Sequence, residues 1–171
     1  MGAGKSSVGR ALGQLLGWAF EDLDARIERE VHTTIAEMFQ AFGEPHFRRV
    51  ERIILQDVLL ELRGGANRVI ALGGGTFAQE ENHKILQASS VPTFFLAAPL
   101  EELWRRCQAD PRAGRPLQTS ADKFRETYLA REKFYRTASV RVETEGKAVE
   151  AIAAEIAGVL KSLRTEQGEV E

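Results

Sequence analysis

Residues 2–6 read Gly-Ala-Gly-Lys-Ser and stand almost at the beginning of the chain. A glycine-rich run that ends in Lys-Ser is typical of a loop that holds phosphates. Its backbone N–H groups point at the phosphate chain, its lysine reaches the terminal phosphates, and its serine hydroxyl binds Mg²⁺. The pattern therefore predicts the chemistry of a nucleoside triphosphate.

The residues that follow this loop predict a helix. Apolar side chains recur at helical spacing and a glycine then marks a stop, in the order Val8, Leu12, Leu15, Leu16 and Gly17. Lys5 and Ser6 are thus expected at a helix N-terminus, where free N–H groups and the helix dipole favour an anion. The alternative, a disordered tail, does not account for this spacing.

The phosphate-loop pattern is shorter here than its full eight-residue form. The full form has a glycine three residues before Gly2 and a buried strand before that glycine. Neither is in the sequence. A sheet that lacks a central strand leaves backbone groups of its neighbours unpaired, so we expect the natural chain to begin upstream of Met1.

Helix and strand signals alternate along the rest of the chain. Alternation with short apolar strands predicts an α/β fold with a parallel sheet and helices on both faces, formed by a single domain over 1–171. Residues 108–120 lack periodicity and are expected to be a lid loop, and 164–171 a polar tail. Strands are predicted over 18–22, 69–72, 91–96 and 140–142, and the principal helices over 5–16, 44–62, 100–107, 121–137 and 148–163.

The composition excludes several function classes. The net charge of −2 provides no overall basic field for nucleic acid, and no apolar run approaches the roughly 20 residues of a membrane span. Residues 105–136 nevertheless hold nine Arg and Lys against four Asp and Glu, a local excess that suits a small anionic ligand. The single cysteine, Cys107, excludes an internal disulfide and fits a reducing cytoplasm. The three histidines show no metal-ligand spacing.

Acidic and basic side chains follow the predicted strands. Asp22 and Asp24 flank one residue at a strand end, where extended chain would place both carboxylates on one side, available for Mg²⁺ and a reacting hydroxyl. Arg48 stands three residues before Glu51 at the start of a long helix, which allows an ion pair. In such folds ligands bind beyond the carboxyl ends of the strands.

Three further features point to ligand binding. Gly73-Gly74-Gly75 comes directly after a buried strand, where three glycines are tolerated if backbone must approach a ligand closely. Arg115-Pro116-Leu117 lies on the predicted lid. Arg106 and Arg131 lie on predicted helices, and arginine binds carboxylate and phosphate through two parallel N–H donors.

In this order the motifs resemble those of the shikimate kinases, from residue 1 to about 146. The matching pieces are the loop at 2–6, Asp22-Leu23-Asp24, the segment 43–51 with its Gly-Glu-x-x-Phe-Arg-x-x-Glu pattern, the triple glycine, Arg115-Pro116-Leu117, and Arg131 with Tyr135. The resemblance implies a P-loop kinase fold and ATP-dependent phosphorylation of shikimate to shikimate 3-phosphate, in aromatic amino-acid biosynthesis. It also implies a cytoplasmic enzyme, expected to be a monomer, with no nucleic-acid or membrane partner.

The resemblance implies a role for each matching residue. Lys5, Asp24 and Arg115 would be catalytic, and Ser6 and Asp22 would hold Mg²⁺. The residues that would bind ATP are Gly2, Ala3, Gly4, Lys5, Ser6, Ser7, Arg106, Arg115 and Lys147. Those that would bind shikimate are Asp24, Arg48, Gly74 and Arg131, with Phe39 and Phe47 forming the wall of the substrate site.

The sequence departs from the family at two further points, and two other functions stay open. Gln118 stands where the family usually has leucine, and the lid before Arg115 is a couple of residues longer, which affects the position of Arg106. Gluconate and nucleoside-monophosphate kinases share the architecture, although Arg48, Arg131 and the triple glycine favour a carboxylic acid substrate. A chain with a shortened phosphate loop could also be an inactive nucleotide-binding module.

Overall fold

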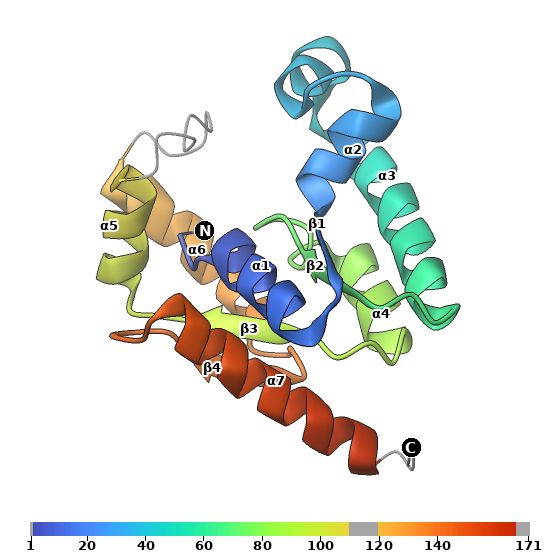
Figure 1. The fold of residues 1–171 in the computed structure, drawn as a ribbon. Coiled ribbons are helices and arrows are strands. Elements are labelled where there is room, and N and C mark those ends of the chain that lie inside the picture. Colours follow the sequence, from blue (N-terminus) through green and yellow to red (C-terminus); the bar gives the residue numbers. More distant parts are fainter. Residues whose placement is uncertain (1, 110–119, 167–171) are drawn as a thin grey trace. The chain divides into compact units, whose positions relative to one another are not determined.

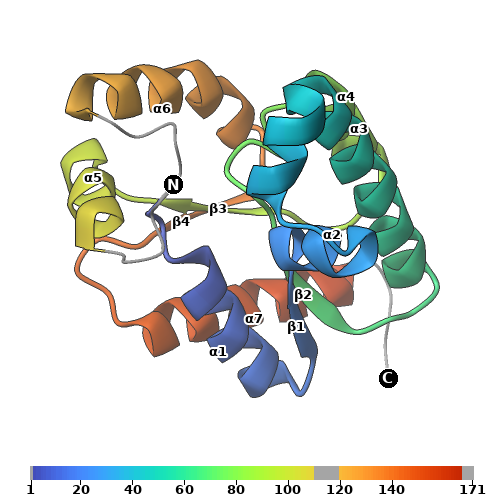
Figure 2. The same cartoon turned by 90° about the horizontal axis from the view of Figure 1, so that it is seen from above.

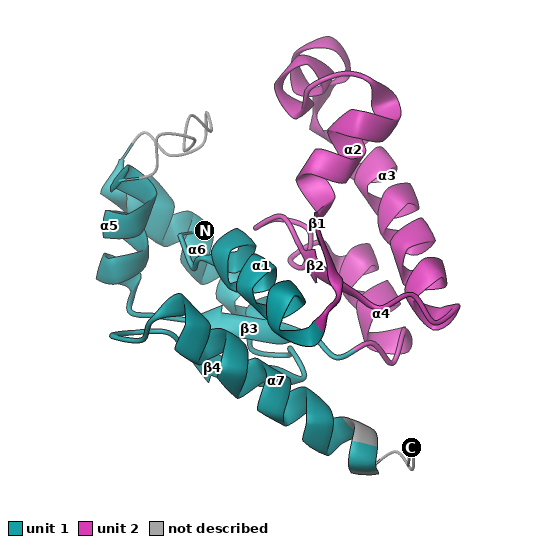
Figure 3. Ribbon diagram, in the orientation of Figure 1, with its two compact units in different colours: residues 1–16, 92–171 teal, residues 17–91 magenta. Residues whose placement is uncertain are grey.

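A computed structural model of the chain describes residues 2–109 and 120–166 (Figure 1). The predicted lid at 108–120 and the Arg115-Pro116-Leu117 motif therefore fall almost wholly outside the described residues. The chain divides into two compact units (Figure 3). Unit 1 comprises residues 1–16 and 92–171, and unit 2 comprises residues 17–91.

Unit 1 contains a two-stranded parallel sheet. Strand β3 (Phe94–Ala97) pairs with β4 (Val140–Glu143), with Phe94 opposite Val140. Within this unit, β3 and β4 lie between α6 on one side and the pair α1 and α7 on the other (Figure 2). The helices of the unit are α1 (Lys5–Leu16), α5 (Leu100–Ala109), α6 (Ala121–Tyr135) and α7 (Val149–Glu166).

Apolar side chains explain the layers of unit 1. The inner faces of α1 and α7 meet through buried residues such as Val8, Leu12, Ile152 and Ile156, each at helical spacing along its own helix. Phe124 of α6 is almost fully buried and stacks on Trp104 of α5 at 5.2 Å between ring centroids. Helices thus cover both faces of this parallel sheet, as the sequence predicts.

Unit 2 contains a second two-stranded parallel sheet. Strand β1 (Ala19–Asp22) pairs with β2 (Arg68–Ala71), with Ala19 opposite Arg68. Helix α2 packs on β1 and on α3, and α3 packs on α4. The helices of the unit are α2 (Leu23–Val31), α3 (Ile35–Arg63) and α4 (Glu80–Ala88).

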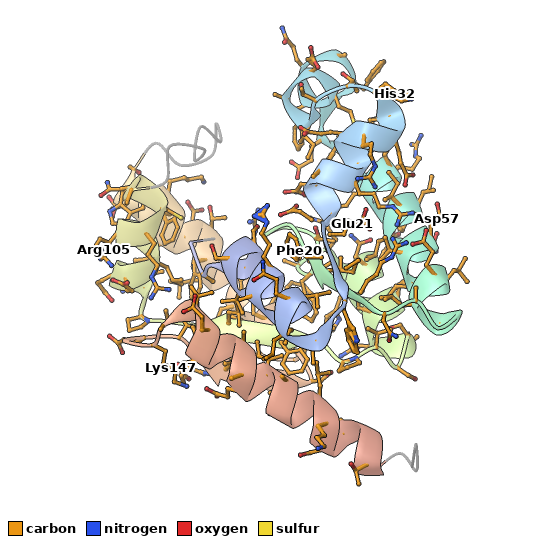
Figure 4. The ribbon with its side chains drawn as sticks, viewed as in Figure 1. Phe20, Glu21, His32, Asp57, Arg105 and Lys147 are labelled. Atoms are coloured by element: carbon orange, nitrogen blue, oxygen red, sulfur yellow. The ribbon has the colours of Figure 1, made fainter. Side chains whose placement is uncertain are left out.

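A buried arginine connects three elements of unit 2. Arg26 of α2 donates to Glu61 of α3 at 2.8 and 3.0 Å, to Glu30 one turn further along its own helix, and to Glu21 of β1. Glu21, which is labelled in Figure 4, also pairs with Arg29 and Arg68. The hydrogen bonds that Arg26 donates to Glu61, opposed by desolvation, raise the pKa of Arg26. Since a buried charge is tolerated only when paired, this network fixes α2 and α3 against β1.

Local signals predict most element ends correctly. Gly17, at a φ of +67°, follows the last residue of α1. Thr34 caps α3 and forms a reciprocal capping box with Glu37. Gly43, at φ +76° and ψ 172°, is non-helical and divides α3 into two helical segments, so the predicted break is confirmed. The strand predicted over 91–96 is displaced and begins at Phe94.

Across the described residues, every helix falls short of the length and apolar character that a bilayer span requires.

Candidate functional site

The glycine loop at the start of unit 1 has the form expected of a phosphate-binding loop. Gly2 and Gly4 adopt φ values of +64° and +76°, which only glycine adopts without strain. A Cβ on Gly2 would lie 2.4 Å from the carbonyl oxygen of Leu103, so the loop backbone packs directly on α5. The glycines thus shape this loop and hold it against the helix.

Helix α1 begins immediately after this loop, at Lys5. Its first turn, which includes the predicted Lys5, Ser6 and Ser7, contains no acidic residue. The backbone N–H of Val8 donates to the carbonyl of Gly4 at 2.9 Å and closes the first helical turn. The positive end of the helix dipole is therefore not neutralised by a carboxylate of its own first turn, which suits an anionic ligand.

Two other predicted ATP residues also belong to unit 1. Arg106 of α5 donates to Glu102 at 2.7 Å and reaches the hydroxyl of Thr144, just after β4, at 3.5 Å. Lys147, which is labelled in Figure 4 and lies before α7, pairs with Glu155 at 2.6 Å. Thr144 is buried and bonds to the carbonyl of Ala97 in β3, so Arg106 lies at the carboxyl ends of both strands of this sheet.

Arg131 lies on α6 in unit 1, one helical turn before Tyr135. Burial raises the pKa of Tyr135, and the guanidinium of Arg131, which hydrogen bonds to it, opposes that rise. The ring of Tyr135 packs near Phe95 of β3, at 5.5 Å between centroids. The tyrosine of this motif therefore fixes the part of α6 that carries Arg131.

The sequence prediction required Asp22 and Asp24 to lie on one extended strand, but in the structure they do not. The strand ends at Asp22, whose carboxylate accepts the backbone N–H of Asp24 at 3.1 Å and caps α2. Asp24 then lies in the first turn of α2. The prediction of two carboxylates on one side of a strand is wrong because Asp22 begins a helix, a role for which its short side chain is well suited.

The triple glycine brings two predicted substrate residues of unit 2 together. A Cβ on Gly73 would lie 2.7 Å from Oδ1 of Asp24, and one on Gly75 would lie 2.8 Å from Nη2 of Arg48. Gly74, the residue between, is buried. The side chains of Asp24 and Arg48 therefore pack against the backbone of the loop after β2, on either side of Gly74. This close approach requires that residues 73 and 75 have no Cβ atom.

Two glutamates of its own helix hold the Arg48 side chain. Nε and Nη2 donate to one oxygen of Glu44, at 3.1 and 2.9 Å, and Nη1 donates to Glu51 at 3.0 Å. The Arg48 guanidinium also lies 5.0 Å from the ring centroid of Phe47, which stacks on Phe39 at 4.9 Å. Phe47 is buried, so its ring is held in place where it makes a cation–π contact with the Arg48 guanidinium.

Glu51 is a site residue that the sequence prediction did not include. It is only 1% exposed, yet it carries the carboxylate that holds Arg48. The spacing of three residues indicated an ion pair, which is confirmed, but burial of the acid was not visible from that spacing. The further partners of Glu51, Thr76 and Asn82, are 25 and 31 residues away in sequence.

A cavity of about 330 Å³ opens next to this cluster in unit 2. Its wall includes Arg48, Arg49 and Arg52 of α3 and the first residues of α4, where Glu81 pairs with Arg52. The lining does not include Asp24, Gly74 or the aromatic pair. It therefore shares only Arg48 with the predicted acid-binding residues.

The predicted site residues divide between the two units. Unit 1 holds the glycine loop, the start of α1 with Lys5, Ser6 and Ser7, and also Arg106, Arg131 and Lys147. All the other predicted residues that the structure describes are in unit 2. Arg115 lies outside the described residues. Among the residues described, no three His, Cys, Asp or Glu side chains gather as a metal-binding group. One unit thus contains a helix start with no acid in its first turn, and the other contains a carboxylate and an arginine that lie against a glycine backbone.

Comparison with known proteins identifies a family. The model of the shikimate kinase family matches residues 1–161. The shikimate kinase of Persephonella marina is 35% identical over 162 residues, which cover 94% of each chain. That of Geobacter metallireducens is 39% identical over 164 residues, 94% of this chain and 88% of the relative.

Solved structures give the same result. Shikimate kinase from Acinetobacter baumannii in complex with shikimate matches with a TM-score of 0.84 and 32% identity, and covers 96% of this chain and 90% of its own. Shikimate kinase from Aquifex aeolicus matches with a TM-score of 0.80 and 30% identity, over 94% of this chain and 92% of its own. The prediction of a P-loop kinase fold is confirmed.

Proposed function

The chain belongs to the shikimate kinase family and phosphorylates shikimate, and from that premise we propose how its own residues perform the reaction. The acceptor is the hydroxyl at carbon 3, the product is shikimate 3-phosphate, and the donor is ATP. The observation that carries the proposal is the meeting of Asp24 and Arg48 on the backbone of one glycine loop. We place the enzyme in the cytoplasm, acting on small molecules and without a nucleic-acid or membrane partner.

The acid is bound through its carboxylate and its hydroxyls. Arg48 and Arg131 bind the carboxylate, because a guanidinium matches its two oxygens with parallel N–H donors. The backbone of Gly74 binds a hydroxyl, and Phe39 and Phe47 cover the apolar side of the ring. The contacts of Arg48 with the buried Glu51 and with Phe47 support this role, since a donor held in place loses less entropy on binding.

Asp24 is the residue that we assign to the reacting hydroxyl. A carboxylate near a bound hydroxyl accepts its proton as the oxygen attacks phosphorus, provided that the carboxylate is held within hydrogen-bonding reach. Its place in the first turn of α2, beside the backbone of Gly73, supports this assignment. Phosphoryl transfer requires mainly positioning and neutralisation of charge, so one base and several cations suffice.

The glycine loop and the start of α1 bind the phosphates of ATP. Backbone N–H groups of residues 2–7 and the ammonium of Lys5 face the phosphate chain, with Ala3 contributing backbone alone. Arg106 and Lys147 lie in the same unit and contribute to nucleotide binding, and Arg115 of the lid completes the cationic set. The positive φ values of Gly2 and Gly4 and the absence of acid in the first turn of α1 support this assignment.

Ser6 of unit 1 and Asp22 of unit 2 carry the kind of oxygen group that binds Mg²⁺, the usual companion of ATP in this family. The Ser6 hydroxyl and the Asp22 carboxylate are hard oxygen ligands, and Mg²⁺ in kinases typically takes one or two protein oxygens and completes its shell with phosphate and water. When bound, the ion neutralises negative charge on the phosphoryl oxygens. The hydrogen bond from the N–H of Asp24 restrains the Asp22 carboxylate, which supports this proposed role.

A coupled assay of ADP release tests the function. We expect ADP release that depends on shikimate, with far slower turnover on gluconate or a nucleoside monophosphate. Lys5→Ala should abolish transfer, and Arg131→Ala should raise the KM for shikimate more than that for ATP. Faster turnover on another acceptor would refute the substrate, and an unchanged KM in Arg131→Ala would refute its carboxylate role.

A further inference from the structure

Glu51 is the centre of a buried polar cluster in unit 2. Its carboxylate receives Nη1 of Arg48 at 3.0 and 3.2 Å, the hydroxyl of Thr76 at 2.7 Å on Oε1, and the amide of Asn82 at 3.4 Å on Oε2. Thr76 is 0% and Asn82 2% exposed. A carboxylate in such surroundings is stable only when each oxygen has a donor, and here each has one besides Arg48.

The three donors come from three different elements. Arg48 is on α3, Thr76 on the loop after β2, and Asn82 in the first turn of α4. Neither Thr76 nor Asn82 is bonded to Arg48 itself; each acts on the carboxylate that Arg48 binds. Their hydrogen bonds therefore restrain the orientation of the Glu51 carboxylate plane, and that plane sets where Nη1 of Arg48 is held.

Thr76 has a second connection to the same loop. A Cβ on Gly73 would lie 2.9 Å from the Thr76 hydroxyl oxygen and 2.7 Å from Oδ1 of Asp24. The Thr76 hydroxyl thus packs against the backbone of Gly73, which the Asp24 carboxylate also contacts. Because Thr76 has no exposed surface, a direct contact with a ligand is excluded, and its influence on one must pass through Glu51 and the loop.

We propose that Thr76 and Asn82 are positioning residues for substrate binding: by holding the buried Glu51 carboxylate they aim the Arg48 guanidinium at the carboxylate of shikimate. The inference rests on the proposed function of Arg48. Without the Thr76 hydroxyl, Oε1 of Glu51 loses its shortest hydrogen bond and the carboxylate can rotate. Arg48 then samples several orientations, and the entropy lost when the substrate orders its side chain weakens binding.

Steady-state kinetics of matched variants test the inference. Thr76→Val removes the hydroxyl at nearly constant volume and should raise the KM for shikimate about tenfold, the loss expected from a buried acceptor deprived of its partner. Asn82→Leu, which removes a longer bond, should raise it roughly threefold. The KM for ATP should stay within a factor of about two in both. Thr76→Ser, which keeps the hydroxyl, should restore the wild-type KM.

A control and a double-variant cycle separate positioning from loss of stability. Thr33→Val removes an exposed hydroxyl that likewise bonds to a glutamate, Glu37, and should leave both KM values unchanged. Thr76→Val acts through Arg48, so adding it to Arg48→Met should cause little further rise in the KM for shikimate. If Thr76→Val is too unstable to assay, the same cycle with Asn82→Leu decides the question.

The outcomes are distinct. A folded Thr76→Val with an unchanged KM for shikimate, or effects of Thr76→Val and Arg48→Met that simply multiply, would overturn the positioning role. Equal rises in the KM for ATP and shikimate would overturn it too, since they would indicate a general loss of structure. Failure of the proposed function is recognised separately, because wild-type protein would then release no ADP in response to shikimate.

Discussion

The guanidinium of Arg48 lies so close to the backbone of Gly75 that a Cβ on residue 75 would stand 2.8 Å from Nη2 and 3.0 Å from Nη1. Gly75 is not among the glycines with positive φ. Its lack of a side chain is therefore required for space and not for backbone conformation. The same loop presents the backbone of Gly73 to Asp24.

Gly75→Ala should impair binding of the acid while the fold persists. The added methyl group must displace the Arg48 guanidinium, and a misplaced cation loses the geometry that binds a carboxylate. We expect the KM for shikimate to rise about tenfold, with a KM for ATP close to wild type. Gly158→Ala, where a Cβ would meet nothing within 4 Å, is the matched control and should leave both values unchanged.

Gly2→Ala should act on the nucleotide. Its Cβ would lie 2.4 Å from a backbone oxygen of α5, which cannot move aside cheaply, and its φ of +64° costs a further 1–2 kcal/mol, roughly, for alanine. We expect the KM for ATP to rise by about tenfold or more. Gly17 has a similar φ of +67° but open space around it, so Gly17→Ala should reduce the free energy of unfolding without reducing the affinity for ATP. Equal kinetics in the two variants would contradict the phosphate-loop assignment.

Signals within a few residues of one another were sufficient to predict most elements. The helix after the glycine loop, the cap at Thr34 and the break at Gly43 all depend on local spacing and backbone preference. The prediction that Asp22 and Asp24 share one side of a strand was wrong because two local rules compete at these residues. Extended alternation competed with helix capping, and capping prevailed because the chain turns into α2 at Leu23.

Contacts that join distant parts of the sequence were not predictable in this way. The triple glycine indicated close approach of a ligand, but not that Asp24 and Arg48 would themselves occupy the space at Gly73 and Gly75. Likewise, nothing in the spacing of Arg48 and Glu51 indicated that α4 supplies a donor to that pair. Such contacts depend on how α3, α4 and the loop after β2 pack, which no single-segment pattern encodes.

The stability of unit 1 should depend on pH through Glu102. Hydrogen bonds from Arg105, then from Arg106, lower the pKa of Glu102 from 4.5 to about 2. Because the folded pKa is the lower one, this stabilisation is complete above about pH 4.5 and disappears as the pH falls towards 2. Glu102→Gln should therefore lower the free energy of unfolding in urea at pH 6, by an amount that shrinks to nothing near pH 2. Glu101→Gln, its exposed neighbour, is the control; a difference that did not change with pH would contradict the assignment.

Glu44 should compete with the substrate for Arg48. One oxygen of Glu44 accepts both Nε and Nη2 of Arg48, and the Glu44 side chain is 57% exposed. An incoming carboxylate that binds this edge of the guanidinium must displace Glu44, while the buried Glu51 stays in place. An exposed ion pair is worth about 0–1 kcal/mol, so Glu44→Gln should lower the KM for shikimate by up to about fivefold.

The direction of that change distinguishes two roles for the glutamate. If Glu44 mainly restrains Arg48, as Glu51 does, then Glu44→Gln would raise the KM for shikimate, because a looser guanidinium must be ordered on binding. If it mainly occupies the binding edge, the KM falls, and the effect weakens at high salt because screening already loosens the exposed pair. Measurement at about 0.05 and 0.5 M salt shows both features at once. Glu126→Gln, which breaks an exposed pair with Lys123 on α6, controls for general charge effects and should leave the KM unchanged at either salt concentration.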